Sequence, residues 1–399
     1  MKRSISTLFV GALLLIMQTS SFATIRRVGF TQSISPVNGL DYVDFQSAHN
    51  AAVTGDTIQL YPATPQISWS GTISKRLVVL GPGYFYNNNT YNIPSGGIPN
   101  ASLQLLPGAI SSSSFTVGVG SAGTVLQGIN SLYVTTSNTL DSLNDILISR
   151  CRNVNVNFDN SGVCNNWIIS QCYNANVTQS GYGISFSANR TITNLRIENT
   201  TGPSINFNAS GPQSPVGVNS GQILNCIFGS STTGVEATYG SLRLNNSTFV
   251  VQNCIDVYGT LGIGLGALTG VSNTIFINNL TVASPSNNPV STNPGSTGNV
   301  FNINPAGNAF FVGYPNNVSG GQTIYSSDGA WQLSSTSPAK NAGIIPGTTT
   351  ATDCGIFGGL NPYKASGIPA VPSFYKLSSP SSTATTNPYI MTFSVRSNN

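Results

Sequence analysis

Charge is what this sequence has least of. Asp, Glu, Lys and Arg make up only 7% of the 399 residues, with 15 basic against 11 acidic side chains. With a hydrophobic content of 39%, this scarcity excludes an intrinsically disordered chain, which needs high charge and low hydrophobicity. The sequence also has no run of basic residues, so it lacks the electrostatic footprint of a nucleic-acid-binding protein.

Metal and redox motifs are equally scarce. His49 is the only histidine, so a histidine-rich metal centre is excluded. A Ser–His–Asp triad could form only around this residue. No two of the six cysteines form a CxxC pair, so a zinc knuckle or a thioredoxin-like redox site has no support. We interpret His49 as a half-buried residue of a short helix.

Long hydrophobic runs are absent after the first residues. Lys2 and Arg3 precede an apolar stretch at 8–17, and Ser21 and Ala23 are small residues at the expected distances from a cleavage site. This pattern predicts a secretory signal peptide over 1–23, and hence a secreted, periplasmic or outer-surface protein. No later run approaches the ~20 apolar residues that span a bilayer, so we expect no transmembrane segment after cleavage.

What the sequence does have is a repeat. The phrase ILNCIF at 223–228 is followed by LNNSTF at 244–249 and VSNTIF at 271–276, and looser copies begin at 125, 148, 169 and 197. A second phrase follows the first in successive repeats: LYV (132–134), VNF (156–158), ISF (184–186), INF (205–207), VEA (235–237) and IDV (255–257). Its apolar–polar–apolar order predicts two inward side chains and one outward. Repeats of 21 to 28 residues with short strands and no long helical pattern predict a parallel β-helix.

Several segments carry a family resemblance. DFQSAHNAAV (44–53) is typical of a short capping helix, and GDTIQLYP (55–62) and KRLVVLGPG (75–83) of the first strands. With the repeats, they resemble the right-handed parallel β-helix of the pectin lyase-like superfamily over about residues 40–360. WQLSSTSPAKNAG (331–343) and DCGIFGG (353–359) are similar to the end of the helix in many secreted bacterial β-helix proteins of unknown function.

The expected fold is therefore all-β, a right-handed solenoid with an N-terminal capping helix over 24–360. A Pro-rich linker and a C-terminal strand segment follow at 361–399, with the strand at 389–397. The resemblance leaves activity open, because the superfamily includes lyases, hydrolases, phage tailspikes and non-catalytic adhesins. Its polygalacturonase-like hydrolases use an adjacent Asp-Asp and a histidine, and this chain has no Asp-Asp and no histidine in the repeats.

Three cysteines recur at one position of the repeat. Cys151, Cys172 and Cys226 occupy the fourth place of the phrase, and Thr200 interrupts the series. Adjacent rungs lie ~4.8 Å apart, within reach of a disulfide. A Cys151–Cys172 disulfide and a stack of small buried thiols are both consistent with this spacing.

The middle residues of the second phrase predict one outward row. Its members are Tyr133, Asn157, Ser185, Asn206, Glu236 and Asp256. Glu236 and Asp256 on neighbouring rungs would lie ~5 Å apart. Such a pair suits a general acid beside a nucleophile, half of a calcium site completed by Asn206, or two exposed acids that share only water. Tyr133, Asn157 and Ser185 would bind sugar by stacking and hydrogen bonds.

A second row is basic. Arg196, Gln222 and Arg243 precede the turn phrase in three successive repeats, so they are expected to align outward, either on an anionic glycan or as ordinary solvated side chains.

Two functions remain open. The first is a non-catalytic protein of the secreted or cell-surface space that binds glycans or serves a structural or adhesive role. The alternative is a polysaccharide lyase or glycoside hydrolase acting on an extracellular polysaccharide, with Glu236 and Asp256 as catalytic candidates. The expected partner is an extracellular polysaccharide or an envelope component. Calcium is the one cofactor considered.

Overall fold

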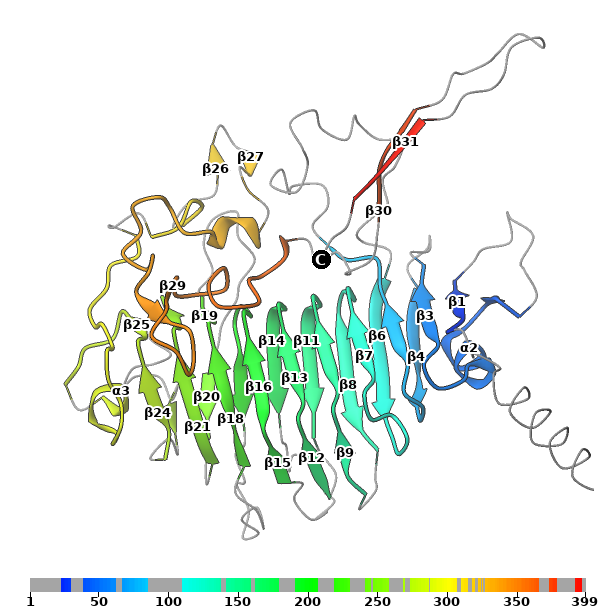
Figure 1. Cartoon of the computed structure of the whole chain (residues 1–399), viewed down its shortest axis with the longest axis horizontal. Helices are drawn as coiled ribbons and strands as arrows, with labels where there is room; N and C mark the ends of the chain where they lie inside the picture. The colour runs from blue at the N-terminus through cyan, green and yellow to red at the C-terminus, as the bar shows by residue number, and fades with distance from the viewer. Residues whose placement is uncertain are drawn as a thin grey trace, which may run out of the picture.

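The chain folds as a solenoid of stacked parallel strands, which confirms the predicted all-β parallel β-helix (Figure 1). The computed structural model describes residues 23–29, 39–61, 67–84, 110–137, 141–158, 162–178, 191–206, 219–229, 241–244, 247–257, 268–269, 273–286, 288–306, 310–314, 318–319, 322–323, 325, 327–365, 373–378 and 392–396. Within these residues, no helix has the length and apolar character needed to cross a bilayer.

The first sheet has eleven strands. In spatial order they are β2 (Asp41–Tyr42), β1 (Ile25–Val28), β3 (Thr57–Leu60), β5 (Val78–Leu80), β7 (Val125–Gln127), β10 (Leu147–Ser149), β13 (Ile168–Ser170), β16 (Leu195–Glu198), β18 (Asn219–Leu224), β21 (Ser247–Gln252) and β24 (Ile275–Ile277).

The second sheet has eight strands and runs alongside the first. They are β4 (Ile67–Ile73), β6 (Ile110–Val117), β8 (Leu132–Thr136), β11 (Arg152–Asn157), β14 (Tyr173–Thr178), β17 (Ser204–Asn206), β20 (Ser241–Arg243) and β23 (Leu268–Thr269).

Two short sheets complete the coils. The third sheet contains β9 (Leu143–Asn144), β12 (Val163–Asn165) and β15 (Thr191–Thr193). A corner sheet contains β19 (Ile227–Phe228), β22 (Ile255–Asp256) and β25 (Leu280–Thr281). All pairings in these four sheets are parallel, so equivalent residues of successive rungs lie side by side.

One inward column shows why the sequence folds this way. Ile148, Ile169, Ile197, Ile223 and Val251 are register partners along the first sheet, and each is fully buried. Burying such side chains is the main favourable term in folding. Because no single rung could enclose them, the core exists only as a stack.

The register corrects part of the predicted repeat. ILNCIF at 223–228 aligns with VQNCID at 251–256 and FINNLT at 276–281, so the starts predicted at 244 and 271 are wrong. The copy predicted to begin at 125 begins at Leu126, the partner of Ile148. LNNSTF resembles the phrase in letters, but its Ser247 pairs with Asn219, four residues before Ile223.

The predicted capping helix is confirmed as α2 (Phe45–Ala51). The Asp44 carboxylate accepts a hydrogen bond from the Ser47 N–H at 2.8 Å, and so caps the helix. The Phe45 ring packs 4.5 Å from that of Phe115 in the core. His49 is 3% exposed, more deeply buried than expected, and its Nε2 accepts from the Ser74 N–H at 3.1 Å.

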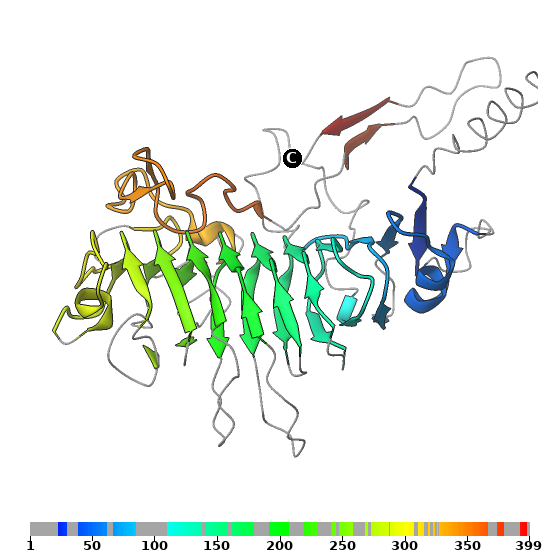
Figure 2. The same cartoon turned by 60° about the horizontal axis from the view of Figure 1, so that its bottom comes forward.

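After the last rung the chain turns back. Beyond α3 (Pro289–Thr292) and the short hairpin of β26 (Val318–Ser319) and β27 (Gln322–Thr323), residues 327–365 return over the corner between the first and second sheets (Figure 2). This returning segment, here called the strap, contains a 3-10 turn at Gly329–Trp331 and the two-residue strands β28 (Gly343–Ile344) and β29 (Ala351–Thr352). Its apolar residues form a second core with Ile227, Ile255 and Leu280 of the corner sheet.

The tail is a hairpin. The predicted terminal strand corresponds to β31 (Thr392–Arg396), which pairs antiparallel with β30 (Ser373–Ser378). Figure 1 shows this hairpin projecting from the body of the solenoid.

Candidate functional site

The outer side of the second sheet is an ordered polar surface. Phe115, Val134 and Val156 are register partners that point into the core and are fully buried. Because side chains alternate along a strand, the residues on either side of them form two outward columns. The first column is Ser70, Ser114, Tyr133 and Asn155, and the second is Thr72, Thr116, Thr135 and Asn157.

The backbone register carries both columns further along the sheet. The first continues at Asn176, Ser204 and Ser241, and the second at Thr178, Asn206, Arg243 and Thr269. Successive members are ~4.8 Å apart along the solenoid, and the two columns are separated by ~6.7 Å along each strand. We call this two-column surface the outer polar face.

Two contacts tie neighbouring strands of this face together. The hydroxyls of Thr116 and Thr135 are hydrogen-bonded at 3.2 Å. The Asn157 Nδ2 donates to the Tyr133 Oη at 3.4 Å. Asn157 lies one strand away and two positions further along, so this contact draws the tyrosine ring across the gap between the columns. Tyr133 remains 37% exposed, whereas Asn157 is 8% exposed.

The chemistry of the face is uncharged hydrogen bonding. Its residues are serine, threonine and asparagine apart from Tyr133 and Arg243, and Arg243 is the only charged residue at any described position of the two columns. Hydroxyl and amide groups both donate and accept, as sugar hydroxyls do. The surface can therefore bind a polar, neutral ligand by hydrogen bonds around one exposed aromatic ring.

Four of the predicted site residues come together on this sheet. Asn157 pairs with Thr135 instead of Tyr133, so Tyr133 and Asn157 occupy adjacent columns where the sequence predicted one row. Asn206 and Arg243 are direct neighbours in the second column. Ser185 and Glu236 lie outside the described residues.

Asp256 does not belong to an outward row. Its register partners are Phe228 and Thr281, so Glu236 holds neither neighbouring position in the sheet. Asp256 is fully buried, and its Oδ2 accepts from the Thr281 hydroxyl at 2.7 Å. Phe228 is part of the solenoid core, whereas Ile255 packs under the strap. The prediction failed because IDV is not the register equivalent of the earlier phrases. Through Ile227, Thr201 and Tyr173, Ile255 aligns with Arg152, four residues before the VNF phrase, so Asp256 lies in the corner sheet and not in the second sheet.

The predicted basic row is also wrong. Arg196 pairs with Gln222 as expected, but the next partner of Gln222 is Val250, and Arg243 belongs to the second sheet. Arg196 forms an ion pair with Glu198, Nη2 to Oε2, at 2.5 Å. This guanidinium therefore has a carboxylate partner in its own strand, and Arg196 and Arg243 do not form one column for an anionic glycan.

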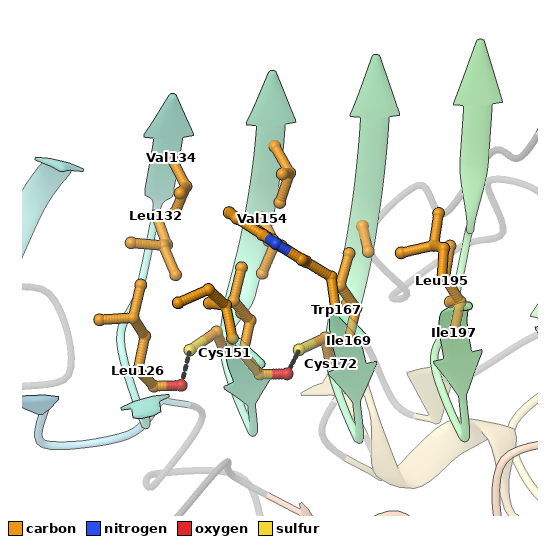
Figure 3. Packing of buried hydrophobic residues seen from close by; sticks show 14 of the residues in the cluster. Leu126, Leu132, Val134, Cys151, Val154, Trp167, Ile169, Cys172, Leu195 and Ile197 are labelled. Carbon is orange, nitrogen blue, oxygen red and sulfur yellow. Dashed lines mark hydrogen bonds between the residues drawn. The ribbon is translucent and has the colours of Figure 1, made fainter. Parts of the chain in front are cut away.

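The cysteines form the predicted thiol stack. Cys151 and Cys172 are buried free thiols whose Sγ atoms donate to the carbonyls of Leu126 and Ile148 on the preceding rungs, at 3.7 and 3.8 Å (Figure 3). The structure forms no disulfide between them. Cys254 joins Cys226 in this column, and the sequence reading missed it because its repeat was placed at 244. Burial raises the pKa of the Cys151 and Cys226 thiols well above the usual value.

A corner of the solenoid holds the strap, which the sequence reading also missed. The third residue of each phrase has a left-handed backbone, with φ of 56° at Gln171, 49° at Asn199, 52° at Asn225 and 58° at Asn253. Their side-chain amides donate to strap carbonyls, those of Asn361, Ile356, Asp353 and Ile344 in that order. We call these four residues the covered corner. The recurring Asn or Gln at this place was the available signal.

The strap fits closely against this corner. Gly359 has φ +75°, and a Cβ there would lie 2.9 Å from the Asn225 Oδ1. A larger residue would therefore clash with the amide and would also be strained by its backbone conformation. The close contact between the strap and the covered corner therefore requires glycine at position 359, the last residue of DCGIFGG.

A buried polar group joins the strap to the first rungs. The Tyr84 and Tyr363 hydroxyls are 2.8 Å apart, and the Tyr363 Oη lies 3.2 Å from the Asp328 Oδ2, to which it donates. Burial raises the pKa of both tyrosines well above the usual value. All three side chains are enclosed, so this group stabilises the strap and offers no surface to a substrate.

In the part of the chain that the structure describes, no three His, Cys, Asp or Glu side chains gather in a way that could hold a metal ion. Comparison of the chain with protein-family profiles, with curated proteins and with solved structures gives no match.

Proposed function

We propose that this protein is a secreted or cell-surface, non-catalytic β-helix that binds an extracellular polysaccharide on its outer polar face. The signal-peptide pattern at 1–23 supports export. The capping helix and the repeating phrases support membership of the pectin lyase-like superfamily. The fold alone supports no activity, because function resides in sites placed on folds.

The observation that carries the proposal is the register of the outer polar face. Serine, threonine and asparagine side chains recur on strand after strand in two columns around the exposed Tyr133. A polysaccharide is the ligand class that offers hydroxyl groups at regular intervals over such a length. A small ligand would use only a fraction of the surface.

The alternative, a polysaccharide lyase or glycoside hydrolase, needs ionisable groups beside the bound sugar. Its strongest candidates were Glu236 and Asp256, and Asp256 points into the core. The alternative therefore has less support on this face, and the binding experiment tests it directly.

The test measures retention of the mature protein by neutral and acidic polysaccharides in affinity electrophoresis. We expect Tyr133→Ala to weaken retention about ten-fold, which corresponds to about 1.4 kcal/mol. Gln222→Ala, an exposed polar side chain on the first sheet, is the matched control and should leave retention unchanged.

The same samples are assayed for reducing sugars and unsaturated products. Product formation would replace the proposal with the enzymatic alternative. Absence of retention by every polysaccharide would overturn it.

A further inference from the structure

We infer that the ligand of the outer polar face is an uncharged, β-1,4-linked glycan in its extended ribbon form, lying parallel to the solenoid axis with about one sugar per strand. This inference rests on the proposed function and names its substrate class.

The first step is periodicity. Equivalent groups recur once per strand, ~4.8 Å apart, in a straight line along the axis. A polymer can repeat its contacts on such a lattice only if its own unit advances by about one strand spacing. Extended β-1,4-linked hexoses do so, whereas α-1,4-linked hexoses coil and leave the lattice after a few sugars.

The second step is the width of the face. The two columns are ~6.7 Å apart, two residues along each strand. A flat sugar ring presents hydroxyls on both of its long edges. A ribbon centred between the columns therefore places one edge over Ser114 and Asn155 and the other over Thr116 and Thr135.

The third step is charge. The described side chains of the two columns have hydroxyl and amide groups and no cation, and the one arginine position within the columns, Arg243, is three strands beyond Asn157. Arg152, at the start of β11, lies outside the columns, and its Nη1 donates to the Asn130 Oδ1 at 3.2 Å. A carboxylated glycan would lose water from its charges without gaining a partner, which is costly. A neutral glycan loses no such solvation.

The fourth step is the position of Tyr133. Its ring is drawn across the gap between the columns by the hydrogen bond from Asn157 at 3.4 Å, and it is 37% exposed. An aromatic ring with a negative face attracts the C–H groups on the flat side of a sugar. It therefore supplies one stacking platform in the middle of a row of hydrogen-bonding groups.

The experiment measures dissociation constants of the mature protein by calorimetry for cellobiose, cellotetraose, cellohexaose and maltohexaose. Because the columns cross the strands of an eight-stranded sheet, affinity should rise with every pair of β-linked sugars. We expect cellohexaose to bind at least about ten-fold more tightly than cellobiose and than maltohexaose.

Thr135→Val removes one hydroxyl from the face and keeps the side-chain shape. It should weaken cellohexaose binding and leave cellobiose binding unchanged or nearly so. The control is Thr57→Val, the same change on the outer side of the first sheet, which should alter neither.

The two proposals fail differently. If polysaccharides are retained but cellohexaose and maltohexaose bind equally, or chain length has no effect, this inference is wrong and the proposed function stands. If no glycan of any linkage binds, both are wrong.

Discussion

Two corners of this solenoid have the same backbone and different partners. Asp145, Asn166 and Asn194, between the third and first sheets, have φ of 59°, 59° and 54°, close to the values at the covered corner. All three are exposed, and Asn166 Nδ2 donates to Asp145 Oδ1 on the preceding rung at 3.0 Å. At the covered corner the amides of Gln171, Asn199, Asn225 and Asn253 instead bind the strap.

The comparison shows that the left-handed backbone turn favours asparagine at both corners. Hydrogen bonds between side chains of neighbouring rungs are not the common cause. Asparagine tolerates positive φ better than other residues with a Cβ. Its side-chain amide then donates to the nearest acceptor. At the covered corner that acceptor is a strap carbonyl, because the strap packs there on the apolar column of Ile227, Ile255 and Leu280.

The largest expected effect comes from weakening the covered corner itself. Trp331 is fully buried in the strap, and its ring centroid lies 5.2 Å from that of Phe311. Trp331→Ala should therefore weaken the packing of the strap on the solenoid by about 3–5 kcal/mol. Because repeats and their cover contact only neighbours, the rungs should stay folded. Limited proteolysis should then cut the strap early in the variant, while urea unfolding of the solenoid shifts little.

Trp167 provides the matched comparison. It is fully buried in the solenoid interior and its Nε1 donates to the Leu143 carbonyl at 2.7 Å. Trp167→Ala should lower the main unfolding transition. If Trp331→Ala lowers that transition as much, strap and solenoid unfold together, and the two corners do not differ in the way described.

The second effect isolates the amide at each corner. Asn199→Gly keeps the left-handed backbone accessible and removes the hydrogen bonds to the Ile356 and Gly358 carbonyls, at 2.8 and 2.7 Å. The Ile356 carbonyl keeps the Tyr363 N–H at 2.8 Å, so the buried Gly358 carbonyl is the one that loses this partner, at a cost of about 1–3 kcal/mol. We expect the free energy of opening the strap to fall by about that amount, measured by hydrogen exchange of the strap amides under native conditions.

Asn166→Gly is the counterpart at the bare corner. Water replaces its exposed hydrogen bond, so the cost should stay within about 0.5 kcal/mol. Equal losses in the two variants would show that the strap contributes nothing to the role of the corner.

The solenoid itself could be predicted because its signals are local and repeated. The capping helix follows from Asp44 and the spacing of Phe45, Ala48 and Ala52, and the inward isoleucines follow from alternation along strands. The thiol stack at Cys151 and Cys172 follows from one residue type recurring at one place.

The site was harder to predict, because it depends on register. Asp256 is buried in the corner sheet, four residues before the place that Asn157 occupies on the second sheet, and rungs of unequal length hide such a shift. The strap is a contact between Asn199 and Ile356, 157 residues apart in the chain. No local pattern encodes which distant segment a corner amide will bind.

The smallest expected effect lies at the other covered end, where α2 closes the first rung. Burial lowers the pKa of His49, since it penalises the charged imidazolium, and the nearby Lys75 charge adds to this. The Nε2 that accepts from the Ser74 N–H must also stay unprotonated to keep that bond. The unfolded chain therefore binds this proton more readily than the folded one.

Stability should consequently be full above the unfolded pKa of 6.5 and fall as pH drops through the interval between that value and the lower folded pKa. Urea midpoints between pH 8 and 5 measure this. Because His49 is the only histidine, His49→Gln should remove the slope in that interval. It should leave the steeper loss at lower pH, where Asp44 and Asp56 take up protons. The Ser47 N–H lowers the pKa of Asp44, and at Asp56 burial raises the pKa but hydrogen bonds from the Thr24 and Val53 N–H groups and from Arg26 outweigh it, so its pKa is also lowered. A slope that persists in His49→Gln would mean that another group titrates there, and that the helix closes the solenoid without help from this ring.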